Sequence, residues 1–428
     1  MNRHLRVADT SARANRLACT AMTLAACMVL TLVLNAALYA APKPPAVVIV
    51  KSTLQDDGWG LPSEGHAVAA KGSRVFVAGT SSGAVTGKNI SIGQYKRSLK
   101  WDGTMGWDGG SNQDDEIFDV AIGRKGEIYV TGYITQGGAK EIRVEKRLKD
   151  LGPNTSTTAS GAVSGDDSGR AIILDKKGNV YTVGRMAMYG WGTDIWVAKY
   201  DPNMQPLGNT TIDGPSKGSA GANALALDST GNLFVAGYRP VAGQGQDIWV
   251  GRLDASFNVV KEAYVAGFGA GNDAAYDILV EKKDVYVVGT IATEAQGLDI
   301  WIGKFDNDLN LIASATYAAP DGHDDFAYAI AKGPGGRYFV AGKVATAASV
   351  DDAWVAIYDK YLRQVAQTTY SSAGVHDDAV YGAIAFSSGQ VLVAGRTFDP
   401  AGNANVWLAR FKGTRLPAVK KPVAPGME

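Results

Sequence analysis

An acidic residue recurs along this chain at a regular spacing, and an aromatic residue usually follows it three positions later. The repeated carboxylates are Asp115, Asp167, Asp273, Asp325 and Asp378. The aromatic residues are Phe118, Tyr276, Tyr328 and Tyr381. Carboxylate oxygens gathered at one place are ligands that Ca²⁺ prefers, so the pattern predicts a ring of calcium ligands. In the alternative interpretation, each Asp accepts backbone N–H bonds and ties neighbouring repeats together.

Two histidines belong to the same acidic motif. His323-Asp324-Asp325 and His376-Asp377-Asp378 stand in consecutive repeats. Imidazole and carboxylate together can bind a metal such as zinc or perform acid–base steps, so His323 and His376 join the candidate metal ligands. The alternative is that a turn histidine was simply inherited with the repeat. The sequence contains no phosphate-binding loop and no His-Glu-x-x-His motif.

One loop differs from its counterparts in the other repeats. The segment from Arg185 to Gly192 contains Met188, Tyr189 and Trp191, whereas the corresponding loops are mostly small and polar. Exposed aromatic and methionine side chains suit a binding contact for a peptide or a sugar. They could equally fold down over the edge of the repeat, and the sequence does not decide between the two.

These candidate sites are carried by a sevenfold repeat. A short apolar run ending in glycine occurs seven times, with steps of 53, 52, 53, 52, 53 and 53 residues. The glycines are Gly79, Gly132, Gly184, Gly237, Gly289, Gly342 and Gly395. Such a regular step is typical of stacked units that share one core.

Each repeat contains four apolar runs separated by turn residues, so each is predicted to form four short strands. The third run carries Trp196, Trp249, Trp301, Trp354 or Trp407 in five repeats and is apolar on both faces. A strand covered on both faces need not alternate. The predicted fold is therefore an all-β, seven-bladed β-propeller with four-stranded blades of about 53 residues, in which the tryptophans pack between blades.

The seventh repeat lacks its fourth strand, and an unpaired strand stands at the other end of the chain. Residues 46–54 precede the first inner strand, where a fourth strand belongs. We therefore expect the N-terminal strand to complete the last blade. The predicted domains are a signal peptide or membrane anchor at 1–40, a Pro-rich spacer at 41–45, the propeller at 46–413 and a disordered Pro/Lys-rich tail at 414–428.

The third repeat resembles the bacterial seven-bladed β-propeller repeat family, abbreviated SBBP. The matching segments are Gly165-Asp166-Asp167, Ala171-Ile172, Asp175, Gly178-Asn179-Val180-Tyr181 and Asp194-Ile195-Trp196-Val197-Ala198-Lys199-Tyr200-Asp201. The resemblance extends over nearly the whole chain after the leader. It implies an exported protein with this shape, and it implies no particular chemistry.

The leader indicates export. Arg3, Arg6, Arg13 and Arg16 precede an apolar stretch from Leu17 to Ala41, which is typical of a secretory signal. The stretch is also long enough to span a bilayer uncleaved. Leu24-Ala25-Ala26-Cys27 resembles a lipoprotein acylation site. The three outcomes stay open, and membrane contact is expected only through a retained or acylated leader.

Charge and cysteine content exclude several functions for residues 41–428. Cys19 and Cys27, the only cysteines, lie in the leader, so no disulfide or thiolate chemistry is available beyond it. Without residues 1–40 the chain has 38 basic and 41 acidic residues, a balance that offers no electrostatic footprint for nucleic acid.

The sequence therefore predicts an exported, monomeric, non-catalytic binding or scaffolding module, periplasmic, associated with the outer envelope or extracellular. Its expected partner is a protein or a polysaccharide of the cell envelope, and its only candidate cofactor is calcium. The alternative is a hydrolase or lyase of envelope polysaccharide that uses the histidine and carboxylate cluster.

Overall fold

The computed structural model describes residues 46–55, 63–83, 87–109, 112–189, 192–214, 216–294, 297–320, 322–346, 350–372, 374 and 376–420. The predicted leader at 1–40 and the spacer at 41–45 lie outside the described residues, as do residues 421–428 of the predicted tail. The described residues contain no helix that could span a membrane.

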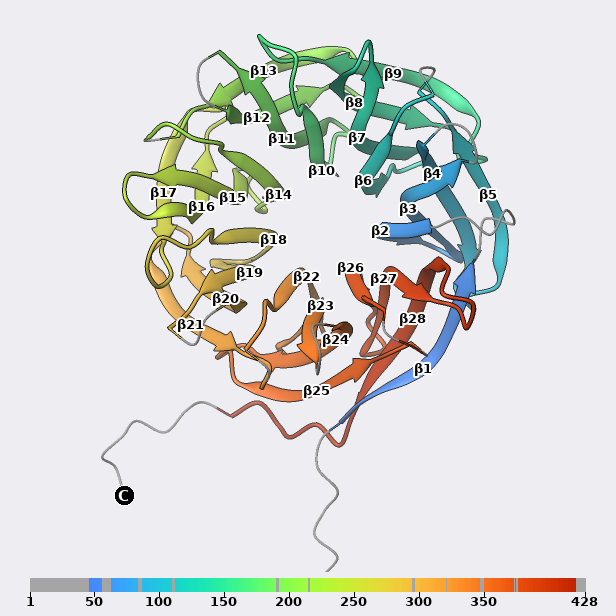
Figure 1. The fold of residues 1–428 in the computed structure, drawn as a ribbon, viewed down its shortest axis with the longest axis vertical. Coiled ribbons are helices and arrows are strands. Elements are labelled where there is room, and N and C mark those ends of the chain that lie inside the picture. The colour runs from blue at the N-terminus through green and yellow to red at the C-terminus, as the bar shows by residue number, and fades with distance from the viewer. Residues whose placement is uncertain are drawn as a thin grey trace, which may run out of the picture. The chain divides into compact units, whose positions relative to one another are not determined.

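Seven antiparallel sheets of four strands each are arranged in a ring (Figure 1). The chain is an all-β, seven-bladed β-propeller, as the repeat predicts. Blade one contains β2 (Ser63–Lys71), β3 (Arg74–Gly83), β4 (Gly87–Lys96) and β5 (Trp101–Trp107). Blade two contains β6 (Glu116–Ile122), β7 (Ile128–Gln136), β8 (Ala139–Arg147) and β9 (Pro153–Ala159). Blade three contains β10 (Ser168–Leu174), β11 (Val180–Met188), β12 (Gly192–Tyr200) and β13 (Pro206–Ile212).

The later blades repeat this order from the inner strand to the outer strand. Blade four contains β14 (Gly221–Leu227), β15 (Leu233–Val241), β16 (Gly245–Leu253) and β17 (Val259–Val265). Blade five contains β18 (Ala274–Glu281), β19 (Asp284–Ala292), β20 (Leu298–Asp306) and β21 (Leu311–Tyr317). Blade six contains β22 (Phe326–Gly333), β23 (Arg337–Thr346), β24 (Val350–Asp359) and β25 (Gln364–Tyr370). Blade seven contains β26 (Ala379–Ala385), β27 (Gln390–Phe398), β28 (Ala404–Thr414) and β1 (Ala46–Gln55).

The N-terminal strand closes the ring, as the sequence predicts. In blade seven the strand order is β1-β28-β27-β26, and β1 pairs antiparallel with β28 from Ala46 opposite Thr414 to Gln55 opposite Val406. The first and last strands of the chain therefore share one sheet (Figure 1). This clasp joins the two ends of the propeller by backbone hydrogen bonds instead of leaving two open sheet edges.

The repeated glycine lies against a β-bulge in the inner strand of every blade. A Cβ built on Gly79 would lie 1.9 Å from the carbonyl oxygen of Glu64, and the other six glycines would meet the corresponding oxygen at 1.9–2.0 Å. In each blade the register shifts by one residue beside this contact. Only glycine lets the bulged strand approach so closely.

The residue left unpaired by each bulge is the one whose side chain reaches the centre of the ring. These residues are His66, Phe118, Arg170, Asn223, Tyr276, Tyr328 and Tyr381. A bulge breaks the two-residue alternation of a strand and redirects one side chain. The glycine repeat therefore determines which side chain at the bulge of each blade faces the central cavity.

The core lies between blades, with one apolar cluster at each of the seven interfaces between neighbouring blades. Trp301, for example, packs among residues of blade four such as Phe234 and Val250. All five predicted tryptophans are at most 2% exposed, which confirms that they pack between blades. Burial of aromatic side chains dominates the energy of such interfaces.

The turns between third and fourth strands add a second repeated contact between blades. In six blades an apolar residue of this turn has a left-handed backbone: Leu99, Leu151, Met204, Phe257, Leu309 and Leu362. A left-handed residue other than glycine costs roughly 1–2 kcal/mol. Each of the six side chains is buried, and burial of a large apolar side chain contributes about 1.5–3 kcal/mol. Burial therefore offsets the backbone cost.

Replacing Trp301 tests how far interblade packing stabilises the ring. Trp301→Ala should lower the free energy of unfolding by about 3–5 kcal/mol, because it leaves a large cavity between blades four and five. The control is Trp101→Ala, since Trp101 is 49% exposed on β5. Denaturant unfolding measures both variants. A loss below about 1 kcal/mol for Trp301→Ala, or equal losses for both, would contradict the packing account.

Candidate functional site

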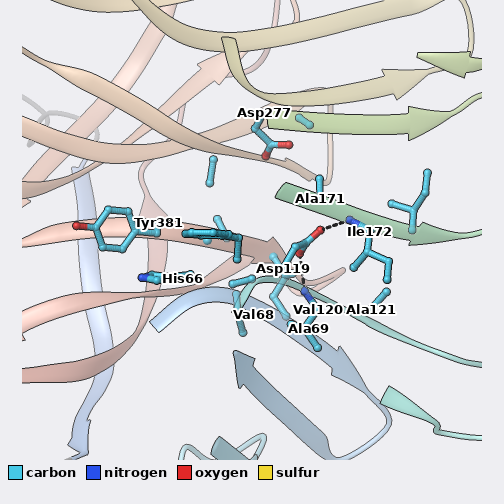
Figure 2. Close-up of a pocket in the computed structure, with 18 of the residues that line it drawn as sticks. His66, Val68, Ala69, Asp119, Val120, Ala121, Ala171, Ile172, Asp277 and Tyr381 are labelled. Carbon is cyan, nitrogen blue, oxygen red and sulfur yellow. Dashed lines mark hydrogen bonds between the residues drawn. The ribbon is translucent and has the colours of Figure 1, made fainter. Parts of the chain in front are cut away.

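A central cavity of about 670 Å³ is the first candidate site. The inner strands of all seven blades line it, with aliphatic side chains such as Ala69, Ala121 and Ala171 interspersed with polar groups. Figure 2 shows these side chains together with Asp119 and Asp277, the two carboxylates that face the same space. A concave site in which polar groups converge among apolar side chains is the usual form of a ligand site.

The seven bulged side chains together form what we call the collar, and five of them form an unbroken run of contacting rings. Tyr276 contacts Tyr328 with ring centroids 5.0 Å apart, and Tyr328 contacts Tyr381 at 5.3 Å. Tyr381 meets the edge of His66 at 5.8 Å, and His66 stacks on Phe118 at 5.4 Å. Burial raises the pKa of Tyr276 and of Tyr381 to about 12, so both phenols present a neutral O–H group.

Blades three and four complete the collar with polar side chains. The guanidinium carbon of Arg170 lies 3.9 Å from the ring centroid of Phe118, and the Asn223 amide donates to the carbonyl of Ala275 at 2.8 Å. The collar therefore has an aromatic sector, from blade five through blades six, seven and one to blade two. Its polar sector consists of Arg170 and Asn223.

His66 is held in place by two acceptors. Its Nδ1 lies 2.8 Å from the carbonyl oxygen of Ile117, and its Nε2 lies 3.4 Å from the carboxylate of Glu64. Burial alone would raise the pKa of Glu64, but the His66 hydrogen bond and the charge of Arg396, 2.7 Å away, lower it to about 2. These contacts link His66 of the collar to Glu64 and Arg396.

Asp119 and Asp277 occupy equivalent positions in blades two and five, one residue beyond the bulge. Asp119 accepts the N–H of Val120 at 2.7 Å and that of Ile172, in the next blade, at 2.8 Å (Figure 2). Asp277 accepts the N–H of Ile278 and that of Ile330, both at 2.8 Å. Each carboxylate therefore clips its own blade to the following one.

Both carboxylates are surrounded by protein and meet solvent only within the cavity. This burial raises the pKa of Asp119 and of Asp277 to about 7, although the two backbone N–H bonds at each group act in the opposite direction. The charge of Asp277 also raises the pKa of Asp119 slightly further. Near neutral pH the two groups are therefore partly protonated.

The five carboxylates predicted as calcium ligands lie in separate backbone pockets. Each is at most 1% exposed, and none of the five lines the central cavity. Asp115 accepts the Gly109 N–H at 2.5 Å and the Thr135 N–H at 2.8 Å. The same pair of contacts recurs at Asp167, Asp273 and Asp325. Each therefore fastens the connection from the preceding blade to the second strand of its own blade.

Asp378 makes one of these two contacts. Its Oδ2 accepts the Ser372 N–H at 2.5 Å, and its buried Oδ1 has no hydrogen-bond partner among the described residues. In blade four Ala220 replaces the acid, and its N–H donates to the carbonyl of Thr193 at 2.6 Å.

Burial raises the pKa of Asp325 to about 6 despite its two N–H donors. The described residues contain no group of three or more potential metal-binding side chains, and calcium binding stays a prediction.

The two histidines of the acidic motif also lie away from the cavity wall. The ring of His376 stacks on Phe398 with centroids 4.5 Å apart. The residue after each histidine accepts a backbone N–H, from Leu298 at Asp324 and from Asp351 at Asp377. The motif is thus built into the blade connections, and its use in metal binding or catalysis stays a prediction.

The blade-three loop presents its tyrosine to solvent. Tyr189 is 80% exposed, whereas Met188 is half-buried, and both border a cavity of about 340 Å³ that Asp194 and Asp213 also line. Trp191, the third predicted binding residue, lies outside the described residues. An exposed Tyr189 is available for a partner, and the binding role of this loop stays a prediction.

Sequence reasoning noted the collar aromatics only as companions of the acidic repeat and missed Asp119 and Asp277 entirely. A signal was present, because Asp115 and Asp273 are each followed four residues later by a second Asp inside an apolar run. Arg170 and Asn223 could also have been found as the two polar replacements at the aromatic position. What the sequence lacked was the position of the bulge, which depends on the pairing of two strands.

No protein-family model and no curated protein matches this chain. Solved structures resemble it at low identity. A protein of unknown function from Dyadobacter fermentans DSM 18053 has a TM-score of 0.49 at 11% identity, over 86% of this chain and 99% of that one. Sqt1 from Chaetomium thermophilum has 0.46 at 13%, over 82% and 86%. The β-propeller domain of the trilobed protease from Pyrococcus furiosus has 0.43 at 11%, over 89% and 100%. We draw nothing about function from these likenesses.

The raised pKa values of Asp119 and Asp277 predict a pH dependence of stability. The folded protein binds more protons than the unfolded chain between the usual Asp pKa of 3.8 and about 7. The stabilising contribution is therefore complete below pH 3.8 and is lost as pH rises through 7, on the order of 4 kcal/mol per group.

Asp119→Ala combined with Asp277→Ala should remove this loss. Alanine is the native residue at the equivalent positions in four other blades: Ala67, Ala171, Ala224 and Ala329. Urea unfolding at pH 4, 5.5 and 8 should show stability falling more steeply with pH in the native chain than in the double variant. Asp308→Ala, which changes an exposed carboxylate, is the control. Parallel curves for the native chain and the double variant would rule out the proposed titration.

Proposed function

We propose that this protein is an exported, non-catalytic binding module of the cell envelope, and that a polysaccharide docks on the collar of its central cavity. The observation that carries the proposal is the aromatic sector of the collar, a run of five contacting rings in a cavity of about 670 Å³. A sugar ring presents an apolar C–H face that stacks on aromatic side chains. Its hydroxyl groups can meet the neutral tyrosine O–H groups and the Asn223 amide.

The strands around the collar are fastened to one another. This favours binding of a ligand without rearrangement of the site. Carboxylates such as Asp115 and Asp325 fasten the connections between blades, and Asp119 and Asp277 clip neighbouring inner strands. Binding residues held on a rigid scaffold lose little conformational entropy on association.

The alternative is a hydrolase or lyase of envelope polysaccharide, and one observation favours it. Asp119 and Asp277 face the same cavity with a pKa of about 7, and paired carboxyl groups perform glycoside hydrolysis. Against this, both oxygens of each carboxylate already accept a backbone N–H. His323 and His376, on which the alternative first depended, do not line the cavity. We therefore assign a structural role to these carboxylates and a binding role to the collar.

Export is supported by the sequence of the leader. Basic residues precede an apolar stretch in residues 1–41, and no cysteine follows Cys27. Together with the resemblance to exported propeller repeats, these features favour a periplasmic, outer-envelope or extracellular protein.

Binding of the full chain to soluble envelope polysaccharides, measured by affinity electrophoresis, tests the proposal. Tyr328→Ala and Tyr381→Ala should each weaken binding at least about fivefold, because stacking of a nucleic-acid base, a ring of similar area, on an aromatic side chain is worth about 1–3 kcal/mol. Trp101→Ala, on the outer strand β5, is the control. Melting curves confirm that each variant is folded.

Three outcomes would contradict the proposal. Absence of polysaccharide binding would remove the assigned ligand, and appearance of new reducing or unsaturated chain ends would favour the enzyme. Loss of affinity in Tyr189→Ala but not in Tyr328→Ala would move the binding surface to the blade-three loop.

A further inference from the structure

The polar sector of the collar contains Arg170, a cation that forms no ion pair among the described residues. Arg170 takes the position that an aromatic ring, including the imidazole of His66, holds in five other blades. Its Nε donates to the Ser168 hydroxyl at 3.2 Å, and its guanidinium lies over Phe118. Among the described residues, no carboxylate lies within ion-pairing distance of it.

A second arginine of the same blade, Arg185, does not line the cavity. Arg185 on β11 is opposite Ser168 on β10, and its Nε is buried with no hydrogen-bond partner among the described residues. Burial lowers the pKa of Arg170 to about 10, and the charge of Arg185 contributes to this lowering, whereas Tyr238, Glu116 and Tyr133 act in the opposite direction. The two cations therefore lie close enough to repel one another.

Other cations near this end of the ring are paired. Arg396 lies 2.7 Å from Glu64, Lys88 lies 2.6 Å from Glu116, and Lys343 is bonded to Asp351. Blade three is thus the exception, because its two arginines share no such partner in the described chain. A buried cation without a counter-charge is costly, and an anionic ligand would relieve that cost.

We propose that Arg170 binds the carboxylate of an acidic sugar whose ring stacks against the aromatic sector of the collar. This inference rests on the proposed function and names the ligand class of the same site. A guanidinium matches a planar carboxylate with two parallel N–H bonds. A uronic acid residue combines that carboxylate with an apolar ring face, which are the two surfaces that the two sectors of the collar offer.

Asp119 and Asp277 would keep the ligand carboxylate at the collar. They lie one residue beyond the bulge on the inner strands of blades two and five, and they face the same cavity (Figure 2). A ligand carboxylate that moved further along the wall would approach these two acids, whereas at the collar it meets Arg170. The sign of the charge therefore changes along the cavity wall.

Isothermal titration of the full chain with two matched probes tests this inference. The probes are a uronic acid trisaccharide and the neutral trisaccharide of the same linkage. The acidic probe should bind at least tenfold more tightly at 20 mM salt, and its advantage should shrink at 300 mM salt because ions screen the charge interaction.

Three variants assign the effect to Arg170. Arg170→Gln should weaken binding of the acidic probe at least tenfold and bring it to the affinity of the neutral probe. Arg170→Lys, which keeps the charge but loses the fork of donors, should weaken it in the same direction. Arg252→Gln is the matched control, since Arg252 pairs with Asp308 near the far end of β16, and it should alter neither affinity.

The outcomes separate the two proposals. If neither trisaccharide binds, the proposed function itself fails. If both bind equally and Arg170→Gln changes nothing, polysaccharide binding stands and the acidic-sugar inference is wrong. If inorganic phosphate alone binds as tightly as the acidic trisaccharide, Arg170 forms a simple anion site, and the inference is likewise overturned.

Discussion

The contact between a repeated glycine and a bulged inner strand is the constraint on which the rest of this propeller depends. At each of seven positions a side chain would place its Cβ about 2 Å from a backbone carbonyl oxygen, a distance that no packed atom tolerates. The glycine lets the bulge form, and the bulge directs one side chain per blade toward the central cavity. This bulged side chain does not pack in the core between blades. Its residue type can therefore vary between blades and can serve ligand binding.

Two kinds of side chain build on this backbone feature. Tryptophans and apolar turn residues fill the interfaces between blades, and carboxylates such as Asp115 and Asp325 fasten the connections at one end. Because these contacts hold the blades in place, the seven bulged residues can differ from one another. Rings in five blades and polar groups in blades three and four give the cavity an asymmetric rim, which a sevenfold repeat alone would not have.

Much of this fold could be predicted from the sequence because its signals are local and repeated. The spacing of the repeated glycines predicted the number of blades. The apolar third strand with its Trp predicted a core between blades, and the missing fourth strand predicted that β1 closes the ring. The site was less predictable. A bulge reverses which side chains face the cavity, and it arises from the pairing of two strands. Asp119 and Asp277 were hidden inside apolar runs, and the acidic repeat suggested ligands where the structure has backbone clips.

The most direct test of the account is the stability of Gly289→Ala compared with Gly106→Ala. A Cβ at Gly289 would lie 2.0 Å from the carbonyl oxygen of Ala274, whereas at Gly106 the nearest atom is 3.4 Å away. Denaturant unfolding should show a loss of at least about 2 kcal/mol for Gly289→Ala and little change for Gly106→Ala. Equal stabilities for the two variants would contradict the claim that glycine is required at the bulge.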